Sequence, residues 1–215
     1  MNYMKAMSQL SHRHPAFWVN HILSNLINSG VVSNNVLLTF SRYRYLPQSF
    51  IDERYTFNMP FWCMSDNELL NIIKSLGEGE ELAFHSQIFD FGRGYHLPLI
   101  DFGNVDRGII DSSTLRELSS YWKLSFRIYN SGRSYHAYGD RLISNDEWIS
   151  FMGSLLLLNK SSGFKLIDER WVGHRLMARY SALRWSFNTS QYKRIPEYVG
   201  YLNSDGLFSD TATNF

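Results

Sequence analysis

Residues 124–138 read LSFRIYNSGRSYHAY, and this stretch predicts a β-hairpin. Over 124–129 large apolar side chains alternate with smaller or charged ones, which is typical of a strand with one buried face. Residues 130–133 provide small, turn-forming residues that include a glycine, and 134–138 provide the returning strand. The hairpin therefore belongs to a sheet with one face in the core.

Polar side chains are expected to gather at the tip of this hairpin. Ser134, His136 and Tyr138 should share one face, because side chains two residues apart on a strand point the same way. The turn adds Ser131 and Arg133. Such a group suits the oxygens of a triphosphate or of a nucleic-acid backbone. A turn of this composition is also common, and a strand histidine is often structural, so the hairpin alone leaves the function open.

Two aspartates lie where short apolar strands are predicted to end. Asp101 follows residues 97–100, and Asp168 follows 164–167. Carboxylates at a sheet edge can hold Mg²⁺ or Mn²⁺ for phosphoryl chemistry. Each aspartate could instead cap the turn that follows it.

Outward from the hairpin, apolar periodicity and turn residues predict a single compact unit in which helices pack on a sheet. No internal repeat and no long linker divides the chain. Helices are predicted at about 15–28, 66–76, 113–122, 145–159 and 171–182, strands at 36–45, 55–63, 82–91, 97–102, 164–167 and 183–187, and a turn at 92–95.

Composition limits the functional classes. A chain of 215 residues with one cysteine, Cys63, needs neither disulfides nor zinc, and a reducing, cytoplasmic location is expected. No apolar run reaches the roughly 20 residues that span a bilayer, so no membrane partner is expected. The 21 Lys and Arg residues nearly balance the 20 Asp and Glu residues. Nucleic-acid binding must therefore be local, and segment 170–194, which has six basic and no acidic residues, is the candidate patch.

The order of these motifs resembles the catalytic core of the archaeo-eukaryotic primase and primase-polymerase superfamily. The resemblance covers about 97–199 and is closest to small bacterial primase-like domains. It implies an α+β fold with an RRM-like, antiparallel or mixed sheet and packed helices. On this basis 81–200 is the expected core, 1–80 an N-terminal extension of helices and strands packed on it, and 201–215 a tail, all within one domain.

The resemblance also implies roles for individual residues. Asp101 and Asp168 would be catalytic metal ligands for Mg²⁺ or Mn²⁺, and His136 would be the third catalytic residue. The expected contacts to a nucleoside triphosphate come from Ser131, Arg133, Ser134, His136, Arg184, Ser186 and Lys193. The expected contacts to DNA or RNA come from His174, Arg175, Arg179 and Arg194.

The first motif departs from the family pattern, which has two acidic residues separated by one position. Here Asp101 is followed by Phe102 and Gly103, and Asp90 has the same pattern. A missing carboxylate weakens a site for dications unless Asp90, Asp106 or Glu169 replaces it.

Three hypotheses therefore remain. The first is a primase-like nucleotidyltransferase that forms phosphodiester bonds, in replication, repair or defence. The second is a catalytically degenerate module that binds nucleotide or nucleic acid, for instance beside a helicase or nuclease partner. The third is a structural interaction protein. A zinc site is not expected, because one cysteine accompanies scattered histidines, and a protein kinase is excluded, because no Gly-rich or His-Arg-Asp loop is present.

Overall fold

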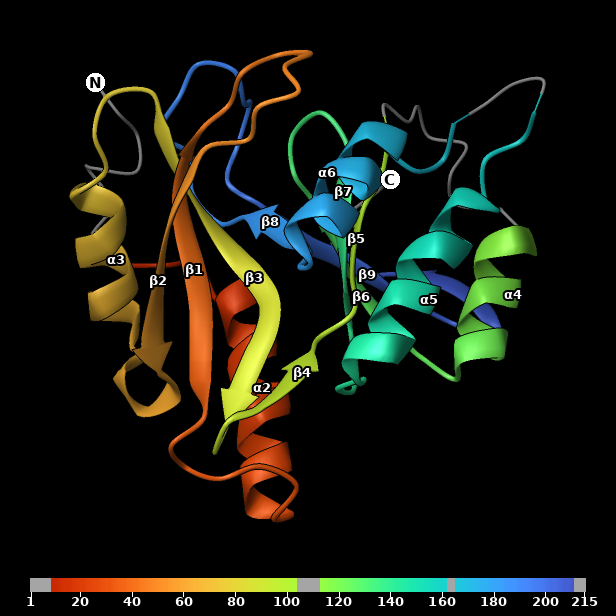
Figure 1. Ribbon diagram of the computed structural model, residues 1–215, viewed down its shortest axis with the longest axis horizontal. Coiled ribbons are helices and arrows are strands. Elements are labelled where there is room, and N and C mark those ends of the chain that lie inside the picture. The colour runs from red at the N-terminus through yellow and green to blue at the C-terminus, as the bar shows by residue number, and fades with distance from the viewer. Residues whose placement is uncertain (1–8, 104–112, 162–164, 211–215) are drawn as a thin grey trace.

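The computed structural model describes residues 9–103, 113–161 and 165–210. Groups of strands are interspersed with helices along the chain, as Figure 1 shows. The helical elements are α2 (Pro15–Asn28), η1 (Phe61–Cys63, a 3-10 turn), α3 (Asp66–Lys74), α4 (Ser113–Trp122), α5 (Asn145–Leu156) and α6 (Glu169–Ala178). The strands are β1 (Leu37–Arg44), β2 (Arg54–Pro60), β3 (Glu80–Asp90), β4 (Arg93–His96), β5 (Leu99–Asp101), β6 (Phe126–Asn130), β7 (Tyr135–Gly139), β8 (Ala182–Arg184), β9 (Glu197–Asn203) and β10 (Gly206–Ser209).

Local signals in the sequence explain where the helices begin. Pro15 is in the first turn of α2, where its missing N–H costs nothing. The Ser65 hydroxyl accepts a hydrogen bond from the Glu68 N–H at the start of α3. Ser144 and Glu147 form a reciprocal capping box at the start of α5. No helix in the described part of the chain is both long and apolar enough to cross a membrane.

The strands form two antiparallel sheets, which confirms the α+β class. The first sheet has the order β2-β1-β3-β4, and β8 pairs with β3 beyond a bend. The second sheet has the order β10-β9-β6-β7-β5. All pairings between the strands are antiparallel. The predicted hairpin of residues 124–138 is β6 and β7, at the centre of the second sheet.

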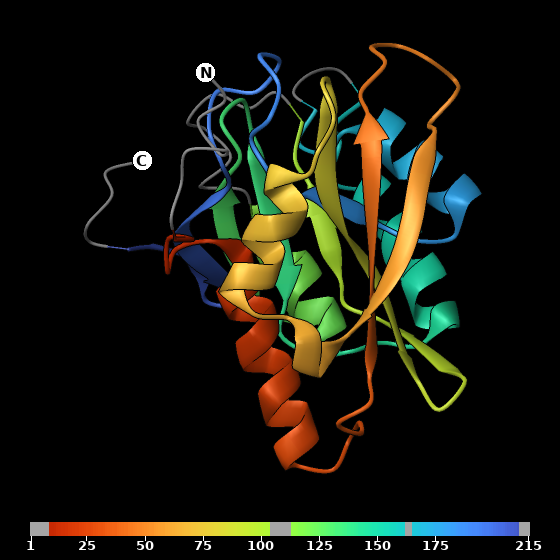
Figure 2. The same cartoon turned by 90° about the vertical axis from the view of Figure 1, so that its left-hand side faces the viewer.

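Helices cover the sheets in separate layers. Figure 2 shows α2 and α3 against one face of the first sheet. There Val19 and Leu23 of α2 and Ile73 of α3 join one core with Phe40 and Phe84. The helices α4, α5 and α6 pack on one face of the second sheet and form a second core with it. The two sheets meet through Tyr129, Tyr138 and Trp185, which belong to the first core.

A turn was predicted at 92–95, but residues 93–95 form most of β4. The reversal comes earlier, at Phe91 and Gly92, which both have positive φ. This is the conformation of a two-residue hairpin turn. The His96 side chain fixes the new strand: it bonds Ser86 and Asn145 and stacks on Trp148.

Two segments outside the predicted core also contribute strands. Strand β1 is hydrogen-bonded to β3 along most of its length, so residues before 80 form part of the same sheet as those after it. Residues 201–209, expected in a tail, complete β9 and form β10 at the edge of the second sheet.

Candidate functional site

A cavity of about 620 Å³ opens where the ends of the two sheets meet α6. Its walls come from the loop 45–53 between β1 and β2, the end of β5, the turn between β6 and β7, the start of α6, and β8. In Figure 1 these segments lie together at the top of the molecule. Of the predicted site residues, the cavity is lined by Asp101, Ser131, Arg133, Ser134, His136, Asp168, His174, Arg175 and Arg184.

The hairpin turn is fastened on both sides. Gly132 has φ +105°, and a Cβ there would lie 3.1 Å from the Arg194 nitrogen. The Ser131 hydroxyl donates to the Ser134 carbonyl at 2.9 Å, inside the turn itself. The Ser134 hydroxyl contacts the Phe102 carbonyl at 2.6 Å and thereby ties the turn to the segment after β5. Arg133 is the exposed side chain of the turn and faces the cavity.

Strand pairing places His136 beside Asp101. The two residues are direct partners in the β5–β7 ladder, and His136 Nε2 lies 3.7 Å from Asp101 Oδ1. That distance is too long for a hydrogen bond. The Nδ1 atom of His136 is buried and has no hydrogen-bond partner. Burial, and secondarily the charge of Arg184, lower the pKa of His136 well below its usual value, so the imidazole is neutral at pH 7.

Asp168 lies next to Asp101 and has a second, structural role. Its Oδ1 accepts hydrogen bonds from the Arg170 and Trp171 N–H groups at 2.9 and 3.1 Å and so caps α6. Its own N–H donates to the Asp101 carbonyl at 3.3 Å. The strand predicted before it is, in residues 165–167, a single bridge between Ile167 and Phe102; residue 164 lies outside the described residues.

The carboxyl group of Asp101 has a raised pKa. Burial, and then repulsion from Asp168, raise its pKa to about 8, although Arg184 and Arg133 oppose the shift. Its side chain is still 27 % exposed, toward the cavity. A positive charge placed between the two aspartates would favour the ionised form.

Gly103, at the second position of the acidic motif, has no room for a side chain. A Cβ there would lie 2.7 Å from the Lys165 carbonyl oxygen. The Gly103 N–H also donates to the Leu166 carbonyl at 2.9 Å, which holds the two segments together. The segment 165–167 that leads to Asp168 therefore occupies the space that a second carboxylate of this motif would need.

Introducing a side chain at Gly103 is expected to destabilise the protein. Gly103→Ala and Gly103→Asp should each lower the free energy of unfolding by about 1–3 kcal/mol, because the backbone of Lys165 must move. Urea unfolding measures this. Gly153→Ala in α5 is the control: a Cβ there meets nothing within 4 Å, so it should stabilise by up to about 1 kcal/mol. A Gly103→Asp protein as stable as the wild type would contradict the packing described here.

Arg184 forms the floor of the cavity together with Tyr192, a residue that the sequence motifs did not single out. The buried guanidinium donates to the Ser131 carbonyl at 2.6 Å and to the Ser186 carbonyl. The Arg184 and Arg133 guanidinium carbons lie 4.0 and 5.5 Å from the centre of the Tyr192 ring. The Tyr192 ring thus makes cation–π contacts with two guanidinium groups below the hairpin turn.

The loop 45–53 supplies further cavity residues that no motif predicted. Asp52 forms ion pairs with Arg54, at 2.8 Å, and with Arg175. Arg175, expected to contact nucleic acid, is 1 % exposed and held in this pair. His174 lies at the cavity wall and contacts the Ser49 carbonyl at 3.2 Å.

Four of the predicted contact residues lie outside the cavity lining: Arg179, Ser186, Lys193 and Arg194. Ser186 is fully buried and bonds Glu81 and the Leu82 N–H. Of the carboxylates considered as replacements for position 103, Asp90 accepts hydrogen bonds from Ser33, and Glu169 pairs with Lys165. Asp106 lies outside the described residues.

The donor set fits a hard divalent cation in part. No group of three or more His, Cys, Asp or Glu residues in the described ranges is arranged as a complete metal site. Mg²⁺, however, is commonly held by one or two carboxylates, with water and substrate phosphates completing its shell. Burial and then repulsion from Asp168 raise the pKa of Asp101, and such a cation would relieve the repulsion.

Two antiparallel sheets with packed helices, and a cavity that joins two aspartates to a Ser-Gly-Arg-x-x-His hairpin, define a primase-like protein. Comparison with protein families is more specific. The pattern of the AEP-like family, archaeo-eukaryotic primase 1D-like, matches residues 63–197, and the chain belongs to this family. The match includes the hairpin and both aspartates but begins after the loop 45–53. No curated protein and no solved structure matches the chain.

Proposed function

We propose that the protein is a primase-like nucleotidyltransferase that binds a nucleoside triphosphate and a nucleic-acid strand in this cavity and forms phosphodiester bonds with Mg²⁺ or Mn²⁺. The observation that carries the proposal is the meeting of Asp101, Asp168 and the hairpin turn around one cavity. These residues are far apart in the sequence, and the fold brings their side chains to one cavity. Family membership supports the same class of activity.

In this proposal Asp101 and Asp168 hold the cation. A dication there supplies charge that stabilises the reacting phosphate and aligns it with a 3′-hydroxyl. Arg133 is exposed at the cavity and binds the phosphate oxygens. His136 is neutral and donates a hydrogen bond from one ring nitrogen, whereas Arg184 contributes positive potential from beneath.

A second candidate function rests on one observation, the closed space at Gly103. With the second carboxylate of the motif excluded, the cavity would bind triphosphate or nucleic acid without forming bonds. Such a module would serve a partner enzyme, such as a helicase or nuclease.

An extension assay separates the two functions. The protein is incubated with a primed single-stranded template, labelled nucleotides and Mn²⁺, and its melting temperature is measured with triphosphate in parallel. Extension supports the transferase. Stabilisation by triphosphate without extension supports the binding module. If neither extension nor stabilisation is observed, both proposed functions are contradicted.

The raised pKa of Asp101 predicts a pH dependence of the metal-free protein. Because the folded state retains a proton that the unfolded state releases near pH 4, this group stabilises the fold at low pH, and the stabilisation is lost as the pH rises through about 8. A cation must displace that proton, so Mn²⁺ affinity should rise by up to about tenfold per pH unit toward pH 8.

Both effects are measurable between pH 6.5 and 8, above the usual pKa of histidine. Urea unfolding without metal should give a stability that falls with pH, and calorimetry should give Mn²⁺ binding that strengthens. Asp101→Asn should flatten the first slope and remove the second. An unchanged slope in this variant would show that Asp101 is not the titrating group.

A further inference from the structure

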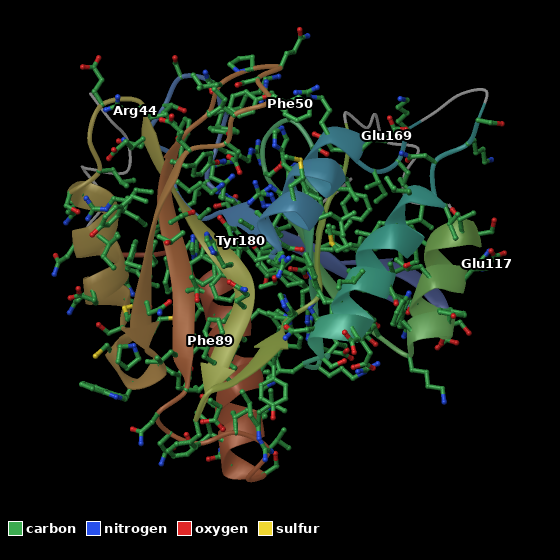
Figure 3. All side chains as sticks on the ribbon, in the orientation of Figure 1. Arg44, Phe50, Phe89, Glu117, Glu169 and Tyr180 are labelled. Atoms are coloured by element: carbon green, nitrogen blue, oxygen red, sulfur yellow. The ribbon has the colours of Figure 1, made fainter. Side chains whose placement is uncertain are left out.

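The loop 45–53 carries more exposed apolar surface than a solvent-facing loop needs. Four of its side chains, Tyr45, Leu46, Phe50 and Ile51, are between 42 and 79 % exposed, and Phe50 is the most exposed. Figure 3 shows Phe50 at the top of the molecule, on the loop that reaches toward α6. Clustered exposed apolar side chains of this kind mark interaction surfaces.

The loop is held firmly in this arrangement. The Ser49 carbonyl accepts hydrogen bonds from Arg170, at 2.9 Å, and from His174, at 3.2 Å, which fastens the tip to α6. At its base Asp52 pairs with Arg54 and Arg175. The apolar side chains are thus presented in a fixed place, which reduces the entropy lost when a ligand binds them.

The charges beside the loop suit a polyanion. Arg170 is exposed and keeps guanidinium N–H groups available beyond its contact with Ser49. The His174 ring lies 6.4 Å from the Phe50 ring, in an edge arrangement. Asp52 is neutralised by its two arginines, and Glu169 at the start of α6 is paired with Lys165. Glu53 lies at the base of the loop, and Asp101 and Asp168 line the cavity beside it.

The same loop is also a wall of the cavity. Tyr45, Leu46, Ser49 and Ile51 line it from one side, and Arg170 and His174 from the other. A strand that crosses Phe50 therefore continues into the space between the hairpin and the two aspartates. Aromatic faces stack unpaired bases whatever their sequence, and neighbouring arginines bind the phosphates.

We propose that this loop is a docking site for single-stranded nucleic acid, with an unpaired base stacked on Phe50 and a backbone phosphate at Arg170. The proposal deepens the proposed function and rests on it, because the bound strand is the one on which the cavity acts. In this proposal the exposed apolar side chains of the loop 45–53 contact unpaired bases. A duplex, whose bases are already stacked, therefore binds less well.

The test is fluorescence anisotropy with a labelled single-stranded oligonucleotide of about 15 nucleotides, in DNA and RNA forms. Phe50→Ala should weaken binding about 5- to 100-fold, and Phe50→Trp should preserve it. Phe91→Ala is the matched control, because Phe91 is 81 % exposed but lies in the β3–β4 turn, which contributes no residue to the cavity lining, whereas the loop of Phe50 contributes several. It should bind as the wild type does. Arg170→Gln should reduce the slope of log affinity against log salt by about 0.7.

Two results would overturn the proposal. One is equal binding by the Phe50→Ala and Phe91→Ala proteins, which is the result expected if the loop serves a protein partner. The other is wild-type protein that binds a duplex as tightly as a single strand. Triphosphate binding in the presence of Mn²⁺, measured on the Phe50→Ala and Phe91→Ala proteins, should be unchanged, because neither side chain lines the cavity. If triphosphate fails to bind at all while Phe50→Ala still weakens strand binding, the proposed function fails and the docking site remains.

Discussion

Asparagine in place of Asp168 is expected to abolish metal-dependent extension while leaving the fold intact. The side chain has two possible tasks, to cap α6 and to hold a cation, and asparagine performs only the first. It caps a helix nearly as well as aspartate does. Its neutral amide removes the charge that a dication needs, and several kcal/mol of transition-state stabilisation corresponds to a loss of about a thousandfold or more in rate.

Alanine at the same position separates the two tasks. Asp168→Ala also removes the hydrogen bonds to the Arg170 and Trp171 N–H groups, so it should lower the free energy of unfolding by roughly 1 kcal/mol. Extension and urea unfolding are measured for both variants. Asp146→Asn, on the exposed first turn of α5, is the control. An Asp168→Asn protein with wild-type activity would assign Asp168 to capping alone.

Replacing Glu81 by alanine is expected to have the largest effect on stability. This carboxylate is fully buried at the start of β3. It accepts hydrogen bonds from the Ser186 hydroxyl, from the N–H groups of Asn188 and Thr189, each at 2.8 Å, and from the Thr189 hydroxyl. Alanine leaves these donors without their acceptor. Each unsatisfied buried donor costs about 1–3 kcal/mol, so the total loss should be about 3–5 kcal/mol.

The effect should extend to the cavity. The segment that Glu81 anchors leads to Tyr192, which lies against Arg184 and Arg133. Urea unfolding gives the stability, and titration with triphosphate and Mn²⁺ below the unfolding range gives the affinity, which should fall. Glu117→Ala, on the exposed surface of α4 in Figure 3, is the control and should change neither quantity. Glu81→Gln should lose less stability, because it retains one carbonyl oxygen. A stable Glu81→Ala protein would contradict this account.

The local elements could largely be read from the sequence, because their signals are short-range. Pro15, Ser65 and Ser144 set helix starts through contacts within four residues of the chain. The alternation in 124–129 predicted a strand, and β6 is that strand. The turn before β4 was predicted too far toward the C-terminus, because phenylalanine rarely adopts positive φ and Phe91 therefore gave no signal for a turn.

The candidate site was predictable only where a family motif names its residues. Asp101, His136 and Asp168 follow from motif order, and strand pairing brings them to one cavity. Asp52 and Tyr192 belong to no motif. Their positions depend on how the loop 45–53 and the segment between β8 and β9 pack against the ends of the sheets. Ser186 and Arg175 look like exposed basic or polar contacts in the sequence, but each is buried against a carboxylate that is more than 100 residues away.

The sequence by itself therefore determined most of the helices and strands, the α+β class and the primase-like motif order, because these depend on periodicity, capping and turn chemistry within short segments. The tertiary structure alone decided that Gly103 faces the Lys165 carbonyl, that Asp168 caps a helix beside Asp101, and that Phe50 stands exposed on a loop whose other residues line the cavity. Those features depend on contacts between distant segments, whose distances no local pattern encodes.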